Sequence, residues 1–481
     1  MKKTESRARR ITRNTFFLAS GEMIARLSTL AIMVYLNRHW TEVALYGQYS
    51  IAVDWVGIFA VVGELGLNAL TVREVAHHRE KTSFFLRHVL VLRSSFSILF
   101  WLALIGISMV LHYEPVLKLA IAVMGIRLIL DAAEGGYIYL FQAHQEMGPY
   151  AMVNMFCALI RMLGIIAFVA AGAEVVGAGS IWVLASTVGL LTMIILGRKR
   201  GWKPEFKKYR PHDSWSVLKL AFPLATFGTL QTLYYRVDSV ILKSLSGNEA
   251  VGFYDTASRI VLSLLAVSQL YSMAIYPVFS SLQDEPKAFC RLAAKASKVL
   301  FFLGLPISIG GFFLSTPLLV LVSGFKYAAA GPPFSILSLS ILPFFLSNIY
   351  VDVLAVKNNF RLNLQFVLLL VLNVVLNFIL IPRWQVQGAA WATVICEYLG
   401  VFSGFFLAAP YLGKMGRIIW FRPLAASLTA AGLMGVGIYF DPRLYWLGLG
   451  PVIYAVALYL FRGLEAEDLA GLKSVFRTAK A

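Results

Sequence analysis

Charged side chains stand inside two apolar stretches on either side of a Ser-Gly-Asn turn at residues 246–248. The stretch before the turn carries Arg236 and Asp238, and the stretch after it carries Asp255 and Arg259. Charges at membrane depth are costly, so they usually face a protein interior or a watery cavity and mark a transport path. Arg236 and Asp238 are two residues apart and cannot share a helix face, so at least one must find its partner elsewhere. The pattern indicates a transport protein.

Arginine suits the binding of an anionic group at such depth, because its planar guanidinium stays charged and can donate two parallel hydrogen bonds. The candidate anion ligands are Arg26, Arg127, Arg161, Arg236 and Arg259. The alternative to cargo binding is an ion pair within one helix face, since partners four residues apart can meet there. The pairs with this spacing are Glu22–Arg26, Arg127–Asp131 and Asp255–Arg259. Arg93 lies nearer one end of its span and is expected to extend its side chain to the membrane surface.

Carboxylates inside spans could instead bind a coupling ion. A buried carboxylate takes up a proton more readily than an exposed one and can serve as a proton or sodium site. The candidates for ion coupling are Asp54, Glu22, Asp238 and Asp255. A hydrogen-bonded structural role is the alternative for Asp54, and an ion pair within one helix is the alternative for Glu22 and Asp255. Neither a cofactor nor a metal site is expected, because the three cysteines, Cys157, Cys290 and Cys396, sit apart without metal-binding spacing.

The elements that must position these side chains are membrane-spanning helices. The chain of 481 residues is 59% hydrophobic and 14% charged, whereas soluble domains have about 25% charged residues. Its apolar runs have helix length rather than the roughly ten-residue alternation of a membrane barrel. An all-α, polytopic fold of about fourteen spans is therefore predicted. The spans lie near residues 14–37, 44–71, 84–111, 115–142, 148–171, 175–197, 215–243, 250–281, 296–322, 331–356, 361–382, 386–411, 418–440 and 443–462.

The net charge of +18 is attributed to cytoplasmic loops rich in Lys and Arg, not to nucleic-acid binding. Lys and Arg concentrate at the termini and in every second loop. The alternate loops hold only Arg38, Lys118, Lys243, Lys326, Arg383 and Arg443. This bias predicts that both termini are cytoplasmic. The basic amino terminus and the apolar segment after it are interpreted as an uncleaved first span, because the segment exceeds signal-peptide length without an Ala-x-Ala site.

A polar loop at residues 198–214 divides six predicted spans (1–197) from six more (215–411). Short matches recur in corresponding positions of the two halves: Gly47-Gln48-Tyr49 with Gly252-Phe253-Tyr254, and Val175-Val176-Gly177-Ala178 with Val386-Gln387-Gly388-Ala389. Matching elements lie six helices apart, which predicts two six-helix lobes in a parallel pseudo-twofold repeat. Two further spans (412–462) and a tail (463–481) follow. The tail is interpreted as an amphipathic helix on the cytoplasmic leaflet or as a frayed polar end.

The ordered set of motifs resembles a known group. It comprises Gly21-Glu22 with Arg26, Tyr46-Gly47-Gln48-Tyr49, Glu64-Leu65-Gly66-Leu67, the Arg236–Arg259 stretch, and Asn377 to Pro382 followed by Gly388. Together with the helix count, these motifs resemble the Wzx-type polysaccharide biosynthesis transporters, which are lipid-linked oligosaccharide flippases. They belong to the multidrug/oligosaccharidyl-lipid/polysaccharide exporter superfamily. The resemblance covers essentially the whole chain, although no single motif is specific.

The resemblance implies two lobes around a central, cationic cavity that opens to either side in turn. The implied cargo is an undecaprenyl-pyrophosphate-linked glycan, such as an O-antigen or exopolysaccharide repeat unit. The implied location is the bacterial inner membrane, where polysaccharide polymerase or assembly proteins would be partners. The two extra helices are similar to those that form a lipid-tail groove in related lipid flippases.

Three rival functions stay open at this point. A lipid II flippase shares the fourteen helices, and the sequence does not exclude it. An ion-coupled drug or cation antiporter of the same superfamily would have a cavity dominated by carboxylates, whereas arginines are prominent in this sequence. An O-antigen ligase or polymerase would carry a large outer loop, and the outer loops here are short. The sequence contains no Walker A motif for ATP hydrolysis, so a transporter rather than an enzyme is expected.

Overall fold

The computed structural model describes residues 2–222, 226–357, 359, 361–412 and 421–461. Every regular element in these ranges is a helix, which confirms the predicted all-α class. The chain divides into two compact units, residues 1–255 and 256–481. The predicted amphipathic tail at 463–481 lies outside the described residues. The predicted division into lobes at residues 198–214 stays a prediction, since these units reflect compactness alone.

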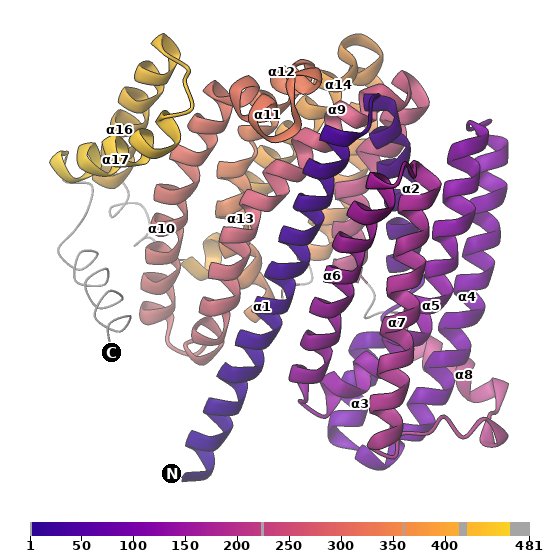
Figure 1. Cartoon of the computed structure of the whole chain (residues 1–481). Coiled ribbons are helices and arrows are strands. Elements are labelled where there is room, and N and C mark those ends of the chain that lie inside the picture. Colours follow the sequence, from indigo (N-terminus) through magenta and orange to yellow (C-terminus); the bar gives the residue numbers. More distant parts are fainter. Residues whose placement is uncertain (1, 223–225, 358, 360, 413–420, 462–481) are drawn as a thin grey trace. The chain divides into compact units, whose positions relative to one another are not determined.

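The first unit is built around α5 (Figure 1). Helix α5 packs against α2, α4 and α7, while α1 packs along α6. The elements are α1 (Lys2–His39), α2 (Val43–Val62), α3 (Leu67–His77), η1 (Arg79–Lys81), α4 (Thr82–Val110), α5 (Pro115–Ala143), α6 (Met147–Ala170), α7 (Val175–Lys199), η2 (Phe206–Lys208), α8 (Pro211–Ala221) and the first half of α9 (Thr226–Ser281).

Two predicted spans of this unit have different bounds in the structure. The span expected at 44–71 breaks where Leu65 (φ 47°) and Gly66 (φ 73°) adopt left-handed conformations. Such residues end a helix, so α2 stops at Val62 and a separate helix, α3, begins at Leu67. Of the span expected at 215–243, the structure describes the end of α8 at Ala221 and α9 from Thr226, which continues to Ser281.

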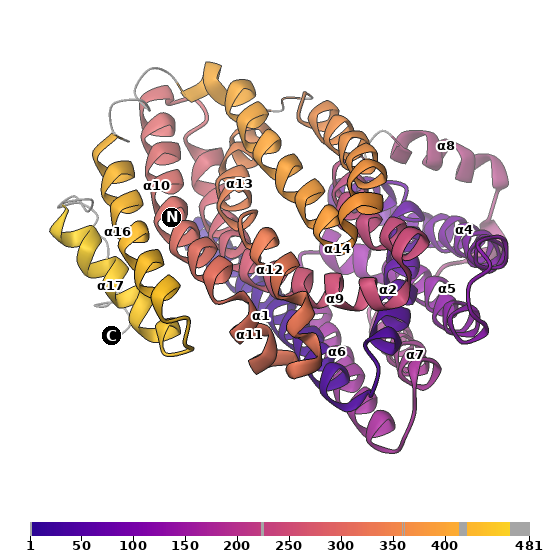
Figure 2. The same ribbon diagram turned by 90° about the horizontal axis from the view of Figure 1, so that it is seen from above.

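The second unit contains the rest of α9, α10 (Pro286–Phe313), α11 (Ser315–Ser323), η4 (Phe325–Ala330), α12 (Gly331–Ser338), α13 (Ile341–Val356), α14 (Arg361–Leu412), α16 (Phe421–Phe440) and α17 (Trp446–Leu460). Helices α16 and α17 pack beside α10 (Figure 2). Phe301 and Leu305 of α10 share a buried apolar cluster with Met434 of α16 and Tyr454 of α17. The span expected at 331–356 is broken, because η4–α12 and α13 meet at a bend of 40°.

Two long helices each change direction at one non-helical residue. Helix α9 kinks at Gly247 (φ 85°), and α14 kinks at Gln385 (φ 46°). Glycine adopts a positive φ without steric cost, which explains the turn predicted at residues 246–248. These kinks confirm that each long helix is a pair of helices, as the sequence predicts.

The described part of the chain contains seven helices that are long and apolar enough to cross a membrane, or eight if η4–α12 and α13 count as one span. Helices α9 and α14 are each counted once there, although each consists of two. If each is counted as two helices, the number of candidate spans comes closer to the fourteen predicted. The chain is a multi-pass, all-helical membrane protein.

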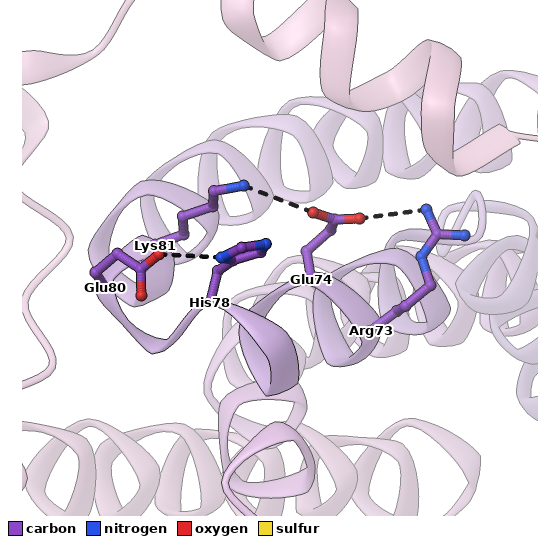
Figure 3. Close-up of polar contacts among 5 residues, drawn as sticks. All are labelled: Arg73, Glu74, His78, Glu80 and Lys81. Atoms are coloured by element: carbon purple, nitrogen blue, oxygen red, sulfur yellow. Dashed lines mark hydrogen bonds and ion pairs between the residues drawn. The ribbon is translucent and has the colours of Figure 1, made fainter.

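One end of the first unit is rich in basic residues. Figure 3 shows the turn from α3 into η1. Glu74 forms ion pairs with Arg73 (3.3 Å) and Lys81 (3.8 Å), and His78 lies 3.2 Å from Glu80. Exposed ion pairs such as these add little stability, about 0–1 kcal/mol each. Their significance is topological, because an end rich in Lys and Arg is the one expected in the cytoplasm.

Candidate functional site

A polar cavity of about 340 Å³ lies among the helices of the first unit. Three arginines and three carboxylates line it, together with amide, hydroxyl and thiol groups. The charged lining residues are Arg93, Arg127, Arg161, Glu64, Asp131 and Glu134. So many ionisable groups at membrane depth are expensive unless they pair with one another or bind a ligand. We call this space the polar cavity.

On one wall, Arg93 of α4 reaches across to α5. Its Nη1 donates a hydrogen bond to Tyr139 Oη (2.6 Å), and Tyr139 Oη donates to Glu64 Oε1 (3.2 Å). Arg93 is only 8% exposed, so the expectation that it extends to the membrane surface is wrong. Gly135 makes this position accessible, since a Cβ there would lie 1.8 Å from Arg93 Nη1. The guanidinium is held inward by packing that no local sequence pattern shows.

On another wall, two predicted anion ligands share one aromatic ring. The guanidinium carbons of Arg127 and Arg161 lie 4.4 Å and 4.9 Å from the centroid of Trp182. Trp182 is fixed by a hydrogen bond from its Nε1 to Tyr49 Oη (2.8 Å). Cation–π contacts leave the donor edge of a guanidinium available to an anion. Two arginines brought together in this way form the strongest candidate anion site in the first unit.

The carboxylates of the cavity pair with some of these arginines and not with others. Asp131 accepts a hydrogen bond from Arg127 Nε (2.7 Å), which is the ion pair expected from their spacing. Glu134, one turn further along α5, lies against α7, where a Cβ at Gly189 would be 2.8 Å from its Oε1. Within the described residues no ion pair to Arg161 is found. Arg161 is therefore the cavity arginine best placed to receive a ligand.

A second charged region joins α2 to α9; we call it the α2–α9 junction. Arg236 donates to Asp54 Oδ1 (2.7 Å) from Nη1. A Cβ at Gly57 would lie 2.5 Å from the Arg236 guanidinium, so this glycine makes room for it. The prediction that Arg236 or Asp238 must find a distant partner is confirmed. The candidate anion ligand Arg236 and the candidate ion site Asp54 thus form one ion pair.

The other two carboxylates of the junction accept hydrogen bonds from hydroxyl groups. Tyr254 Oη donates to Asp238 Oδ2 at 2.7 Å. Asp255 accepts a bond from Ser239 Oγ at 2.6 Å and a second from Ser50 Oγ on α2. The two acceptor residues and the three donor residues are all buried. These hydrogen bonds give both carboxylates a structural role, and they do not test ion binding.

The two glycines that mark the predicted repeat lie at the crossing of α2 and α9. A Cβ on Gly47 would lie 1.9 Å from the backbone oxygen of Asn248, and a Cβ on Gly252 would lie 2.6 Å from that of Val43. Small residues allow helix backbones to approach this closely in a membrane. The motif glycines are therefore contact points between the two helices.

Beside this crossing, Glu114 accepts hydrogen bonds from Lys243 Nζ (3.0 Å) and Asn248 Nδ2 (3.0 Å). Burial alone would raise the pKa of this carboxyl, but its backbone hydrogen bond and Lys243 outweigh that effect and hold the pKa below the ordinary 4.5. Lys243 also lies over the ring of Tyr113, at 5.4 Å. The cluster ties the start of α5 to the kink of α9.

The remaining candidates are Glu22 and Arg26 on α1 and Arg259 on α9. Arg26 Nε donates to Glu22 Oε1 at 3.1 Å on α1, and both side chains are more than a third exposed. Arg259 belongs to the second unit and is half-buried. Sequence reasoning missed Glu64 and Glu134 as site residues. The spacing of Glu134, seven residues after Arg127 and three after Asp131, places it on their helix face and could have revealed it.

The sequence matches a known protein family. Residues 11–283 match the family described as polysaccharide biosynthesis protein. The capsular polysaccharide biosynthesis protein CapF of Staphylococcus aureus is 27% identical over 199 residues, covering 40% of this chain and 49% of CapF. The protein named "Probable flippase AglR" of Haloferax volcanii is 28% identical over 273 residues, covering 53% and 54%. The chain spans about half the length of the curated relatives it matches.

Solved structures share the fold. The lipid II flippase MurJ in an inward closed conformation superposes with a TM-score of 0.69 at 17% identity, covering 95% of this chain and all of that one. An inward-facing multidrug transporter of the MATE family gives 0.67 at 13% identity, covering 82% and 96%. At such identity the likeness concerns the fold alone. The matched profile covers more than half of the chain, and with these neighbours it confirms the resemblance: this chain is a multi-pass membrane protein of the polysaccharide biosynthesis protein family.

Proposed function

We propose that the protein is a flippase that moves an undecaprenyl-pyrophosphate-linked oligosaccharide from the inner to the outer leaflet of a bacterial inner membrane. The carrying observation is the polar cavity, where Arg127 and Arg161 lie over one tryptophan ring. A pyrophosphate needs several charge-assisted hydrogen bonds to leave water, and arginine supplies them in a planar fork. Arg26, Arg236 and Arg259 are the further candidate ligands along the path.

In the proposed alternating-access cycle, the α2–α9 junction is a contact that must open and close. With residues 215–411 as the second lobe, the Asp54–Arg236 pair and the Gly47–Asn248 approach join helices of different lobes. A closely packed helix interface of this kind switches between two discrete arrangements and does not deform continuously. Protonation or sodium binding at Asp54, Glu22, Asp238 or Asp255 would weaken such contacts and couple the cycle to an ion gradient.

The distribution of charge supports cytoplasmic termini. The α3–η1 turn and the segment after α7 carry clustered Lys and Arg, whereas the opposite end holds Glu42, Glu114 and Glu174. A Lys- and Arg-rich end stays in the cytoplasm during membrane insertion. The cargo would accordingly enter from the end that carries α3 and α8. Polymerase or assembly proteins acting on the flipped glycan are the expected partners.

The decisive experiment is deletion of the gene, followed by measurement of surface glycan and of lipid-linked intermediates. Loss of a surface polysaccharide, with its undecaprenyl-linked repeat unit accumulating inside the cell, is the expected result. Normal glycan together with hypersensitivity to cationic drugs would transfer the protein to the antiporter function. Accumulation of lipid II with arrested peptidoglycan synthesis would make it a lipid II flippase.

Complementation with point variants then tests the site. Arg26→Ala and Arg259→Ala are expected to abolish export at normal protein level, and Lys at either position should retain some export if charge alone suffices. Full complementation by both Ala variants would remove these two residues from the phosphate path while leaving Arg127 and Arg161 to be tested.

A further inference from the structure

An apolar groove of about 970 Å³ lies on a different face of α5 from the polar cavity. Its walls come from α4 (Leu90, Val91, Ser94), α5 (Ala133, Tyr137) and α7 (Leu190, Ile194, Arg198). Its basic end is closed by the segment 202–206, which follows α7 and which we call the shelf. The groove takes no part in the transport path proposed above.

We propose that this groove binds one anionic phospholipid, with an acyl chain along the helices and the phosphate at the shelf. The apolar walls offer a glycan few hydrogen-bonding partners, but they match a hydrocarbon chain. Two exposed cations, Arg198 and Lys203, stand at the shelf end. Basic pockets between membrane helices near the headgroup level are suited to anionic lipid headgroups.

The length of the groove fits one leaflet. Leu190 and Arg198 are eight residues apart on α7, which corresponds to roughly 12 Å at 1.5 Å per residue. Half of the hydrocarbon core of a bilayer is about 15 Å. A lipid whose phosphate meets Arg198 would therefore place most of one chain against α7. Because α4 and α7 are both long and apolar enough to cross a membrane, the groove between them would face lipid chains.

The shelf is a built feature rather than a loose connection. Arg87, which is 5% exposed, donates from Nη1 to the backbone oxygen of Glu205 (3.0 Å). Glu205 has φ of 24°, an uncommon value for a residue with a side chain. Trp202 is buried and stacks on His144, with ring centroids 4.9 Å apart. A strained backbone held by a buried arginine is the kind of feature that structures retain at binding sites.

The charge at the shelf favours an anion despite one lining carboxylate. Glu205 lines the groove, but its carboxylate forms an ion pair with Lys208 at 2.8 Å. Arg198 and Lys203 remain as the cations that line the groove. Lys199 and Lys207 are equally exposed neighbours that do not line it. Replacing Arg198 and Lys203, or Lys199 and Lys207, removes two positive charges in each case. The two double variants therefore have the same net charge and differ only in whether the lost cations line the groove.

The test is native mass spectrometry of the purified full-length protein titrated with phosphatidylglycerol, phosphatidylcholine and undecaprenyl pyrophosphate. We expect tighter retention of phosphatidylglycerol than of phosphatidylcholine. The double variant R198A/K203A should lose roughly tenfold or more of the phosphatidylglycerol affinity, and K199A/K207A should not. Ala133→Trp, which fills the groove, should lower phosphatidylglycerol retention without changing charge.

Three results would overturn the proposal. They are equal retention of the two phospholipids, an equal loss in both double variants, and displacement of phosphatidylglycerol by undecaprenyl pyrophosphate at equal concentration. The last result would assign the groove to the lipid of the cargo. Circular dichroism and thermal unfolding of each variant separate loss of the site from loss of the fold. Because the readout is lipid binding, the result does not depend on the proposed flippase activity.

Discussion

The polar cavity and the α2–α9 junction contain the same types of charged residue but satisfy them differently. In the junction, Arg236 contacts Asp54 at 2.7 Å, and Asp238 and Asp255 accept bonds from buried hydroxyl groups. In the polar cavity, Arg127 and Arg161 lie on the ring of Trp182. Junction charges are bonded to specific side chains of neighbouring helices. In the cavity, Arg161 is held by the aromatic face, and Arg127 adds an ion pair to Asp131 on its own helix.

Under the proposed function, this difference separates charges that hold helices together from charges that bind cargo. Removing one partner of a buried ion pair leaves an uncompensated charge, which lowers stability. Removing an arginine from an aromatic face loses a weaker contact. The two regions should therefore respond in opposite ways: junction variants lose stability first, and cavity variants lose transport first.

The largest loss of stability is expected for Gly47→Ala. Its Cβ would lie 1.9 Å from the backbone oxygen of Asn248, so α2 and α9 must move apart, at a cost of about 3 kcal/mol. Gly106→Ala in α4 is the control, because no atom lies within 4 Å of its added Cβ. Thermal unfolding in detergent measures both. Equal midpoints for the two variants would show that the junction is not closely packed.

Arg236→Leu is expected to cost about 2 kcal/mol, since it removes the ion-pair partner of the buried Asp54 carboxylate. The double variant Arg236→Leu/Asp54→Leu should recover much of this loss, because both charges of the pair are then removed. A double-mutant cycle in denaturant or heat gives the coupling energy. Additive losses would mean that the pair contributes nothing and that Arg236 acts elsewhere.

Arg161→Ala is expected to change stability by about 1 kcal/mol or less, the size of one cation–π contact. Export should nevertheless fall roughly tenfold or more, since each charged hydrogen bond to cargo contributes about 1.5–3 kcal/mol. Arg161→Lys should restore part of the export. Normal export by the Ala variant, at normal protein level, would remove the cavity from the transport path and erase the contrast with the junction.

The smallest expected effect is a loss of stability at low pH through Glu114. The pKa of Glu114 lies below 4.5 in the folded protein, so the stability from its contacts with Lys243 and Asn248 is present above about pH 4.5. That contribution is lost as the pH falls through the folded-state value. Wild type should therefore lose slightly more stability than Glu114→Gln on acidification below this pH, measured by thermal unfolding. Parallel curves for the two proteins would contradict the role of this cluster.

Several structural features follow directly from local sequence. Gly247 predicts the kink in α9, because a positive φ at that turn favours glycine. The spacing of four residues in Glu22–Arg26 and Arg127–Asp131 allows both ion pairs, which were the alternative to cargo binding and which the structure contains. Each depends on helix geometry alone, which is set by neighbours in the chain. Composition and hydropathy likewise establish a multi-pass helical membrane protein.

Partners that are distant in the chain were decided by tertiary packing. Asp54 pairs with a residue 182 positions away, and Arg93 points inward because Gly135 leaves space for its guanidinium. Helical periodicity specifies which residues share a face but not which face meets which neighbour. That choice depends on how α2, α4, α5 and α9 pack at close range, where a single absent Cβ decides whether a charge reaches the cavity, the junction or the membrane surface.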